Sequence, residues 1–222
     1  MKVAIPYVDR IIDTDNGMIN TLVVENQKLF SMVVEDIYQQ IAGKEGRIVI
    51  SEANKPCNVA KKVEILNQFV PFELNTRTIL SHLNTELERI SLTEDYYEGS
   101  MKTLSELENH INTLCNELPF EISITKMNMS SLIKSVGVEI RDDFVSTAEK
   151  VIEYMDLIRH LEKADKLFIL INYRSYITDD ELCLFYDTVL SHGFHILLLE
   201  SSSRVKLLTE YRITIDSDLC EI

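Results

Sequence analysis

The chain has 222 residues, of which 45% are hydrophobic, so it is long enough to fold around a sizeable core. This composition excludes intrinsically disordered, collagen-like and mucin-like chains. The chain carries 36 acidic and 22 basic residues, and the resulting net charge of −14 favours solubility and repels polyanions when averaged over the surface. Net charge alone therefore argues against nucleic-acid binding.

Neither an export signal nor a membrane segment is predicted. The first ten residues, MKVAIPYVDR, lack the apolar stretch of a signal peptide, and the longest aliphatic runs, residues 167–171 and 196–199, are too short to cross a bilayer. The cysteines are widely separated and form no CxxC pair, which indicates incidental thiols rather than a zinc site or disulfides. They are Cys57, Cys115, Cys183 and Cys220. We expect a cytoplasmic protein that makes no membrane contact.

The N-terminal part predicts short strands around a helix. Apolar runs punctuated by proline, glycine and asparagine predict strands at residues 3–5, 18–24 and 47–51. Between the last two, apolar residues recur at helical spacing from residue 27 to residue 42, with Asn26 as the N-cap and Gly43 as the stop.

The middle of the chain predicts two long helices. Each has a narrow apolar stripe with the spacing of a coiled-coil seam. The stripes are Leu80, Leu83, Leu87 and Ile90, and then Leu104, Leu107, Ile111, Leu114 and Leu118. We expect a loop at residues 94–99 and an antiparallel helical hairpin, because neither helix could bury its seam alone. Residues 84–121 carry a net charge of −7, which a solvated helix face explains.

The C-terminal third predicts a parallel α/β arrangement. A helix at residues 144–161 precedes the apolar run 167–171, which is typical of a strand buried on both faces. A capping box at residues 178–181 opens a helix to His192, and residues 194–200 form a second buried strand. A strand, helix and strand in this order predict a right-handed parallel crossover.

These patterns together predict an α/β protein with an inserted helical domain. The α/β head comprises residues 1–65 and 142–222 and resembles the core of nucleotide hydrolases, but it has no phosphate-binding loop. The inserted helical leg comprises residues 66–141.

Catalytic motifs are missing from the sequence. Neither GxGxxG nor GxxxxGK[ST] occurs, and the buried strand ends at Ile171 with Asn172 where nucleotide hydrolases place a magnesium-binding acid. The histidines are scattered, and no serine lies in a GxSxG elbow. We therefore predict that the chain is not an enzyme and binds no nucleotide.

Positive charge is concentrated in two stretches. Residues 44–62 carry a net charge of +3 and residues 126–141 a net charge of +2. Such stretches could form a stripe that contacts phosphates, which requires only a few close cations and not a positive total charge. Scattered, solvated lysines are the alternative interpretation.

The order of several segments resembles a known family. The segments SLIKSVGVEIR (131–141), KLFILIN ending at Asn172, YITDDEL (176–182) and HILLLE ending at Glu200 resemble, in that order, the accessory spacer-acquisition protein of type II-A CRISPR systems. The resemblance implies a non-enzymatic homotetramer whose α/β heads and helical legs form a ring around double-stranded DNA, threaded from an end. Such proteins act beside integrase subunits and the RNA-guided effector nuclease in antiviral spacer acquisition.

The resemblance also assigns candidate DNA-binding residues. Lys134 matches the lysine of the family's LIKSLG motif, and Arg141 and Lys126 are its basic neighbours in the sequence. Glu139 stands where relatives carry a lysine, so the strength or the location of the DNA contact is expected to differ.

Calcium binding is the second property that the resemblance implies. Relatives bind calcium through acidic residues near the head–leg junction, but residues 122–130 of this chain contain none. The acidic residues that flank this gap are the candidate ligands, Glu117, Glu121, Glu139, Asp142 and Asp143. Because calcium takes six to eight oxygen ligands, we predict binding that is weaker than the family pattern, or absent.

Two other functions stay open. One is an oligomeric scaffold that recruits other adaptation proteins through its helical seams without binding DNA. The other is a diverged nucleotide hydrolase, against which the missing phosphate loop and the missing acid after Ile171 argue.

Overall fold

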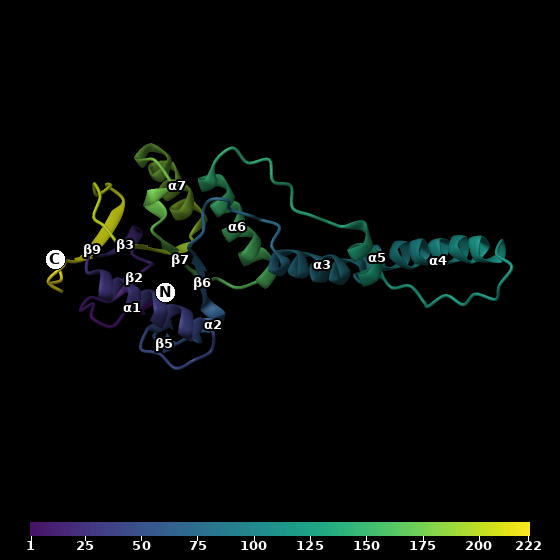
Figure 1. The fold of residues 1–222 in the computed structure, drawn as a ribbon, viewed down its shortest axis with the longest axis horizontal. Helices are drawn as coiled ribbons and strands as arrows, with labels where there is room; N and C mark the ends of the chain where they lie inside the picture. Colours follow the sequence, from purple (N-terminus) through teal and green to yellow (C-terminus); the bar gives the residue numbers. More distant parts are fainter. The chain divides into compact units, whose positions relative to one another are not determined.

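The computed structural model describes residues 1–222 as two compact units (Figure 1). The first unit comprises Met1–Phe72 and Asp143–Ile222, and the second comprises Glu73–Asp142. The predicted insertion begins at residue 66, but β6 (Val63–Leu66) pairs with β7 (Leu167–Ile171) in the first unit. The second unit therefore starts only after this strand and the segment that follows it.

A parallel five-stranded sheet forms the centre of the first unit. Its order is β6-β7-β8-β3-β9, and every neighbouring pair is parallel. The remaining strands are β3 (Ile19–Val24), β8 (His195–Glu200) and β9 (Glu210–Ile215). Every residue of β7 is buried, and β7 and β8 are parallel across a helix, so the predicted buried strands and their crossover are confirmed. The α/β fold class is confirmed with them.

Helices cover both faces of this sheet. Because right-handed crossovers that step in one direction along a sheet put their helices on one face, α6 (Thr147–Glu162) and α7 (Asp179–His192) share a face. On the other face, α1 (Gln27–Ile41) shares a core with residues of a small antiparallel sheet. That sheet has the order β2-β1-β4-β5. Its strands are β2 (Ile12–Asp13), β1 (Lys2–Ala4), β4 (Val49–Glu52) and β5 (Lys55–Pro56). A short helix, α2, spans Val59–Lys62.

Helix ends in the first unit follow capping chemistry. The capping box that opens α7 forms as predicted, and Gly193 ends the helix with a φ of 65°. A second capping box, Ser146 with Glu149, starts α6 three residues later than the sequence analysis expected. None of the helices is long and apolar enough to span a membrane.

The second unit differs from the predicted helical hairpin. It contains α3 (Arg77–Ser91), α4 (Glu94–Asn116) and α5 (Met129–Val136). The expected loop at residues 94–99 is wrong, because these residues form the first turns of α4. Glu94 and Asp95 favour that start, since carboxylates stabilise the positive end of the helix dipole.

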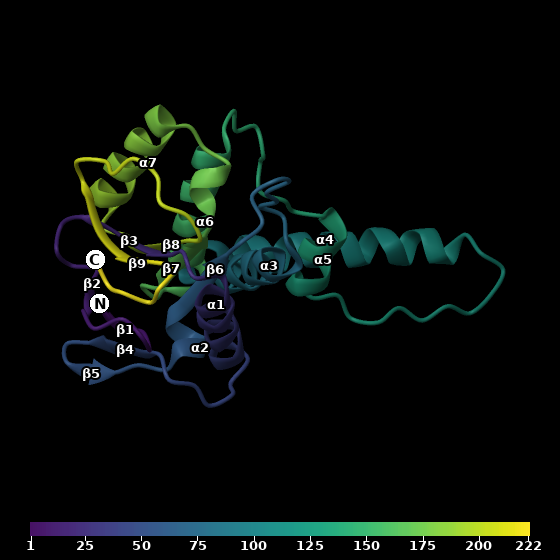
Figure 2. The ribbon, with the colours of Figure 1, turned by 60° about the vertical axis from the view of Figure 1, so that its left-hand side comes forward.

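The predicted antiparallel pairing of the two long helices is also wrong. The helix α3 packs mainly against α5, and the chain returns along α4 through residues 117–128, which form no helix or strand (Figures 1 and 2). Along the predicted seam Leu104 is buried, but Leu114 and Leu118 are 51% and 52% exposed. The stripe predicts an apolar helix face, but it does not specify which segment covers it.

The α7 capping box gives a test of the first unit. The Thr178 hydroxyl accepts a hydrogen bond from the Glu181 amide, so Thr178→Ala should lower the free energy of unfolding by about 1 kcal/mol. Thr188→Ala is the matched control, since that hydroxyl only returns a hydrogen bond to Leu184 within the same helix. Urea denaturation of both variants measures the difference. Equal stabilities would contradict the role assigned to the cap.

Candidate nucleic-acid interface

The short helix α5 presents Lys134, the main sequence candidate for a phosphate contact. The Asn128 side chain caps this helix by accepting a 2.8 Å hydrogen bond from the Ser131 amide, and Gly137 ends it with a φ of 72°. Ile133 is buried, whereas Lys134, in the last turn, is exposed. The packing of α5 thus holds the main chain at Lys134 and leaves its side chain exposed to solvent.

Side-chain hydrogen bonds to the main chain hold the other two predicted cations in place. The Met127 amide donates a 2.7 Å hydrogen bond to Glu108 Oε1 on α4, which anchors the chain beside Lys126. Asn75 binds both main-chain groups of Ile140, at 2.8 and 2.9 Å, next to Arg141. Neither anchor can be predicted from local sequence patterns, because each joins residues that are far apart in the chain.

The three cations form a series along the second unit rather than one cluster. Lys126 precedes α5 and Lys134 lies in its last turn, so residues 127 and 128 and about 7.5 Å of helix separate them. Lys126, Lys134 and Arg141 are exposed and take part in no ion pair. They are therefore free to contact phosphates.

The other predicted basic stretch, residues 44–62, is partly neutralised. It lies in the first unit, where Arg47 pairs with Asp36 at 3.2 Å and Lys62 pairs with Glu52 at 2.9 Å. These two cations are less available to an external anion than the cations around α5.

The predicted calcium ligands do not come together. Glu117 caps the far end of α4, and Glu121 follows it in the returning segment. Glu139 and Asp142 flank Ile140, which is bound to Asn75 just before α3. No group of three or more carboxylate, histidine or cysteine side chains lies close enough to hold a metal ion. Residues of one chain therefore do not fit a calcium ion, which needs six to eight oxygens.

Asn172, where a hydrolase would place its acid, joins the ends of two strands. It follows β7 with a φ of 53°, and its Oδ1 accepts 2.8 Å hydrogen bonds from both the amide and the hydroxyl of Ser201, the first residue after β8. The amide oxygen is thus engaged with the neighbouring strand end.

The connection from β8 to β9 has an unusual constraint. Parallel strands are normally joined by a dozen or more residues that include a helix, but residues 201–209 make this crossover without one. A segment of this kind provides no internal partners for its main-chain polar groups, so other groups must supply the hydrogen bonds.

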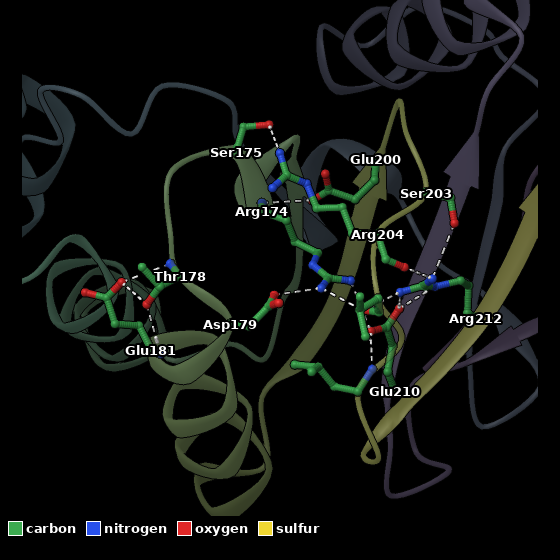
Figure 3. Close-up of polar contacts among 12 residues, drawn as sticks. Arg174, Ser175, Thr178, Asp179, Glu181, Glu200, Ser203, Arg204, Glu210 and Arg212 are labelled. Atoms are coloured by element: carbon green, nitrogen blue, oxygen red, sulfur yellow. Dashed lines mark hydrogen bonds and ion pairs between the residues drawn. The ribbon is translucent and has the colours of Figure 1, made fainter.

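Two arginines and one buried glutamate supply such hydrogen bonds to Arg204, Val205 and Leu207 (Figure 3). Arg174 is 2% exposed, and it donates to the Val205 carbonyl at 2.8 Å and to Glu210 at 3.4 Å. Arg212 donates to the carbonyls of Arg204 and Val205 and pairs with Glu210 at 2.6 Å. Glu210 is fully buried and also accepts from the Leu207 amide at 3.3 Å. We call Arg174, Glu210 and Arg212 the crossover clamp.

Sequence reasoning missed the crossover clamp. Arg174 lies in a short 3₁₀ helix, η1 (Tyr173–Ser175), just after a buried strand, and Glu210 begins β9, which was not predicted. A single arginine three residues after a predicted buried strand is a weak signal on its own, and only the fold shows that it meets a buried carboxylate.

Glu200, at the end of β8, is buried beside the clamp. Burial raises the pKa of its carboxyl to about 7, although a 3.1 Å hydrogen bond from the Arg174 amide and the nearby guanidinium partly oppose this. The ordinary pKa is 4.5, so between pH 4.5 and pH 7 the folded protein keeps a proton that the unfolded chain releases. The stability that this group contributes is therefore fully present below pH 4.5. It falls as the pH rises from 4.5 and is lost above pH 7.

Glu200→Gln tests this titration. The amide keeps an oxygen that can accept the Arg174 hydrogen bond but never becomes charged, so the variant should be more stable than the wild type at pH 8, by up to about 3 kcal/mol. The advantage should shrink towards pH 5, where the wild-type carboxyl is also neutral. Thermal melts of both proteins across this pH range measure it, and parallel pH profiles would contradict a raised pKa at Glu200.

Comparison with known proteins identifies the family. A family model described as "CRISPR-associated protein (Cas_Csn2)" matches residues 40–219. The "CRISPR-associated protein Csn2" of Enterococcus faecalis is 25% identical over 181 residues, which cover 81% of each chain. The crystal structure of Stu0660 of Streptococcus thermophilus has a similar fold, with a TM-score of 0.55 and 13% identity over 90% of this chain and 68% of that one. The chain belongs to the Cas_Csn2 family of CRISPR-associated proteins.

Proposed function

We propose that this protein acts in CRISPR spacer acquisition by binding the ends of double-stranded DNA. It does so without catalysis and without reading base sequence, as a homotetrameric ring. Integrase subunits and the RNA-guided effector nuclease of the same system are its partners. Membership of the Cas_Csn2 family supports the CRISPR role.

The observation that carries the DNA-binding proposal is the set of free cations around α5. Lys126, Lys134 and Arg141 lie on anchored main chain, are exposed, and have no carboxylate partner. Contacts from such side chains to phosphate oxygens position a duplex but carry no sequence information. In a symmetric ring each of these cations would be repeated around the central axis, so a few per chain would suffice.

The net charge of −14 is compatible with this proposal because the negative charge is unevenly distributed. Residues 84–121, which include all of α4, carry a net charge of −7, whereas residues 126–141 carry +2. Only the charges that face the phosphates decide the contact, since charges farther than about 8 Å are screened at physiological salt.

A scaffold without DNA binding is the second candidate, and exposed apolar residues favour it. Leu114, Leu118 and Phe120, at the end of α4 and just beyond it, are 51%, 52% and 73% exposed. Apolar side chains grouped in this way are typical of a surface that contacts another protein. A pure scaffold would form an oligomer through these residues but would not bind DNA, even at low salt.

A mobility-shift titration of one plasmid, either linearised or relaxed and circular, tests the proposal. We expect the linear form to be bound and the closed circle to be bound much more weakly, because a closed circle offers no end to thread. We also expect affinity to fall steeply with salt. Equal binding of the two forms would contradict end threading, and no binding of either at low salt would favour the scaffold.

Charge reversal of Lys134 tests the assignment of the site in the same assay. Lys134→Glu should weaken binding of linear DNA by at least about tenfold at about 0.1 M salt, because it removes one phosphate contact per chain and adds repulsion. Lys102→Glu is the control, since Lys102 is an exposed lysine of the acidic helix α4. Equal affinities of the two variants would remove Lys134 from the interface.

A further inference from the structure

The crossover clamp fixes the main chain of residues 204–207 and leaves the side chains of this segment free. Arg174 and Arg212 bind the Val205 carbonyl, Arg212 binds the Arg204 carbonyl, and Glu210 accepts from the Leu207 amide. Because these bonds all go to main-chain groups, they hold the segment without occupying its side chains. Figure 3 shows the guanidinium groups of Arg174 and Arg212 converging near Glu210.

The free side chains include two cations. Arg204 and Lys206 are exposed and take part in no ion pair, and Arg204 donates only a 3.2 Å hydrogen bond to the Ser175 hydroxyl.

The carboxylates nearest to these cations are already used inside the protein. Asp179 pairs with Arg174 at 3.1 Å, and Glu210 pairs with both clamp arginines. Glu200 is buried and accepts from the Arg174 amide. Arg204 lies near enough to Glu200 to lower the pKa of that carboxyl, but no ion pair joins Arg204 or Lys206 to any of the three carboxylates. Both cations are exposed, so the outer side of the segment carries positive charge.

We propose that residues 201–206 form a second phosphate-contact site, on the first unit, in which Arg204 and Lys206 bind the backbone of double-stranded DNA. This inference rests on the proposed function and adds contact residues to it. Guanidinium and ammonium groups donate to phosphate oxygens, and the exposed hydroxyls of Ser175 and Ser202 can add neutral donors. A segment that is ordered before binding loses less conformational entropy when it binds.

Arg174 and Arg212 are positioning residues in this site. They act through the main chain, and each is at least nine-tenths buried, so neither reaches the duplex. The distinction has a measurable consequence, because only a residue that contacts phosphate changes the number of counterions released on binding.

The test compares Arg204→Glu/Lys206→Glu with Lys28→Glu/Lys102→Glu, which changes the net charge equally at exposed lysines elsewhere. The probe is a short blunt-ended fluorescent duplex, titrated at several salt concentrations. We expect the first variant to weaken binding by about tenfold for each lost phosphate contact near 0.1 M salt and to flatten the salt dependence. The control should keep the wild-type salt slope.

The outcomes separate this inference from the proposed function. If the wild type binds the duplex and the Arg204/Lys206 variant behaves like the control, the inference is wrong and the proposed function stands. If the wild type does not bind, both are wrong. If the variant keeps its DNA affinity but changes the sedimentation coefficient, the segment contacts another copy of the chain instead, which also overturns the inference.

A third variant tests the positioning role. Arg212→Met should reduce duplex affinity and speed proteolysis of residues 203–207, but it should keep the wild-type salt slope, since the contacting cations are still present. Arg212→Lys, which retains a donor, should restore part of the affinity. An altered salt slope in Arg212→Met would show that Arg212 itself contacts phosphate, and unchanged affinity would overturn its positioning role.

Discussion

The connection between β8 and β9 constrains the α/β unit more than any other segment. Nine residues must cross from the end of one parallel strand to the start of another without a helix to satisfy their main-chain groups. Arg174, Glu210 and Arg212 supply partners for the main chain of Arg204, Val205 and Leu207, and all three side chains are at least nine-tenths buried. A charge buried in this way is stable only while it is paired, so each member of the clamp depends on the others.

This dependence relates the fold to the proposed function. The same charges that close the crossover leave Arg204 and Lys206 exposed on an ordered segment, while in the other unit α5 and Asn75 do the equivalent for Lys134 and Arg141. In both places, hydrogen bonds from side chains hold the main chain, and a neighbouring cation stays exposed without an ion pair. Residues 84–121, which include α4, account for half of the net charge of −14 and are separate in sequence from both sets of cations.

The sequence predicted those parts of the fold that depend on local patterns. The buried strands β7 and β8, the α7 capping box and the α/β class follow from apolar runs and cap residues that lie close together in the chain. It did not predict which segment covers α4 or that β9 exists. The β9 sequence, EYRITI, interleaves charged residues with apolar ones, and Arg174 and Glu210, which bind each other, lie 36 residues apart. Contacts between residues so far apart depend on how the strands are connected, and they cannot be predicted from the periodicity of apolar residues or from motif spacing.

Amide hydrogen exchange at Leu207 tests the central claim, that the buried Glu210 carboxylate orders the crossover. The Leu207 amide donates to Glu210 Oε2, so we predict that it exchanges far more slowly than the neighbouring amide of Lys206, for which the structure shows no acceptor. In Glu210→Gln the charge that pairs with Arg174 and Arg212 is lost, and the Leu207 protection should fall even where the core strands stay protected. Fast exchange at Leu207 in the wild type, or unchanged protection in Glu210→Gln, would contradict the account.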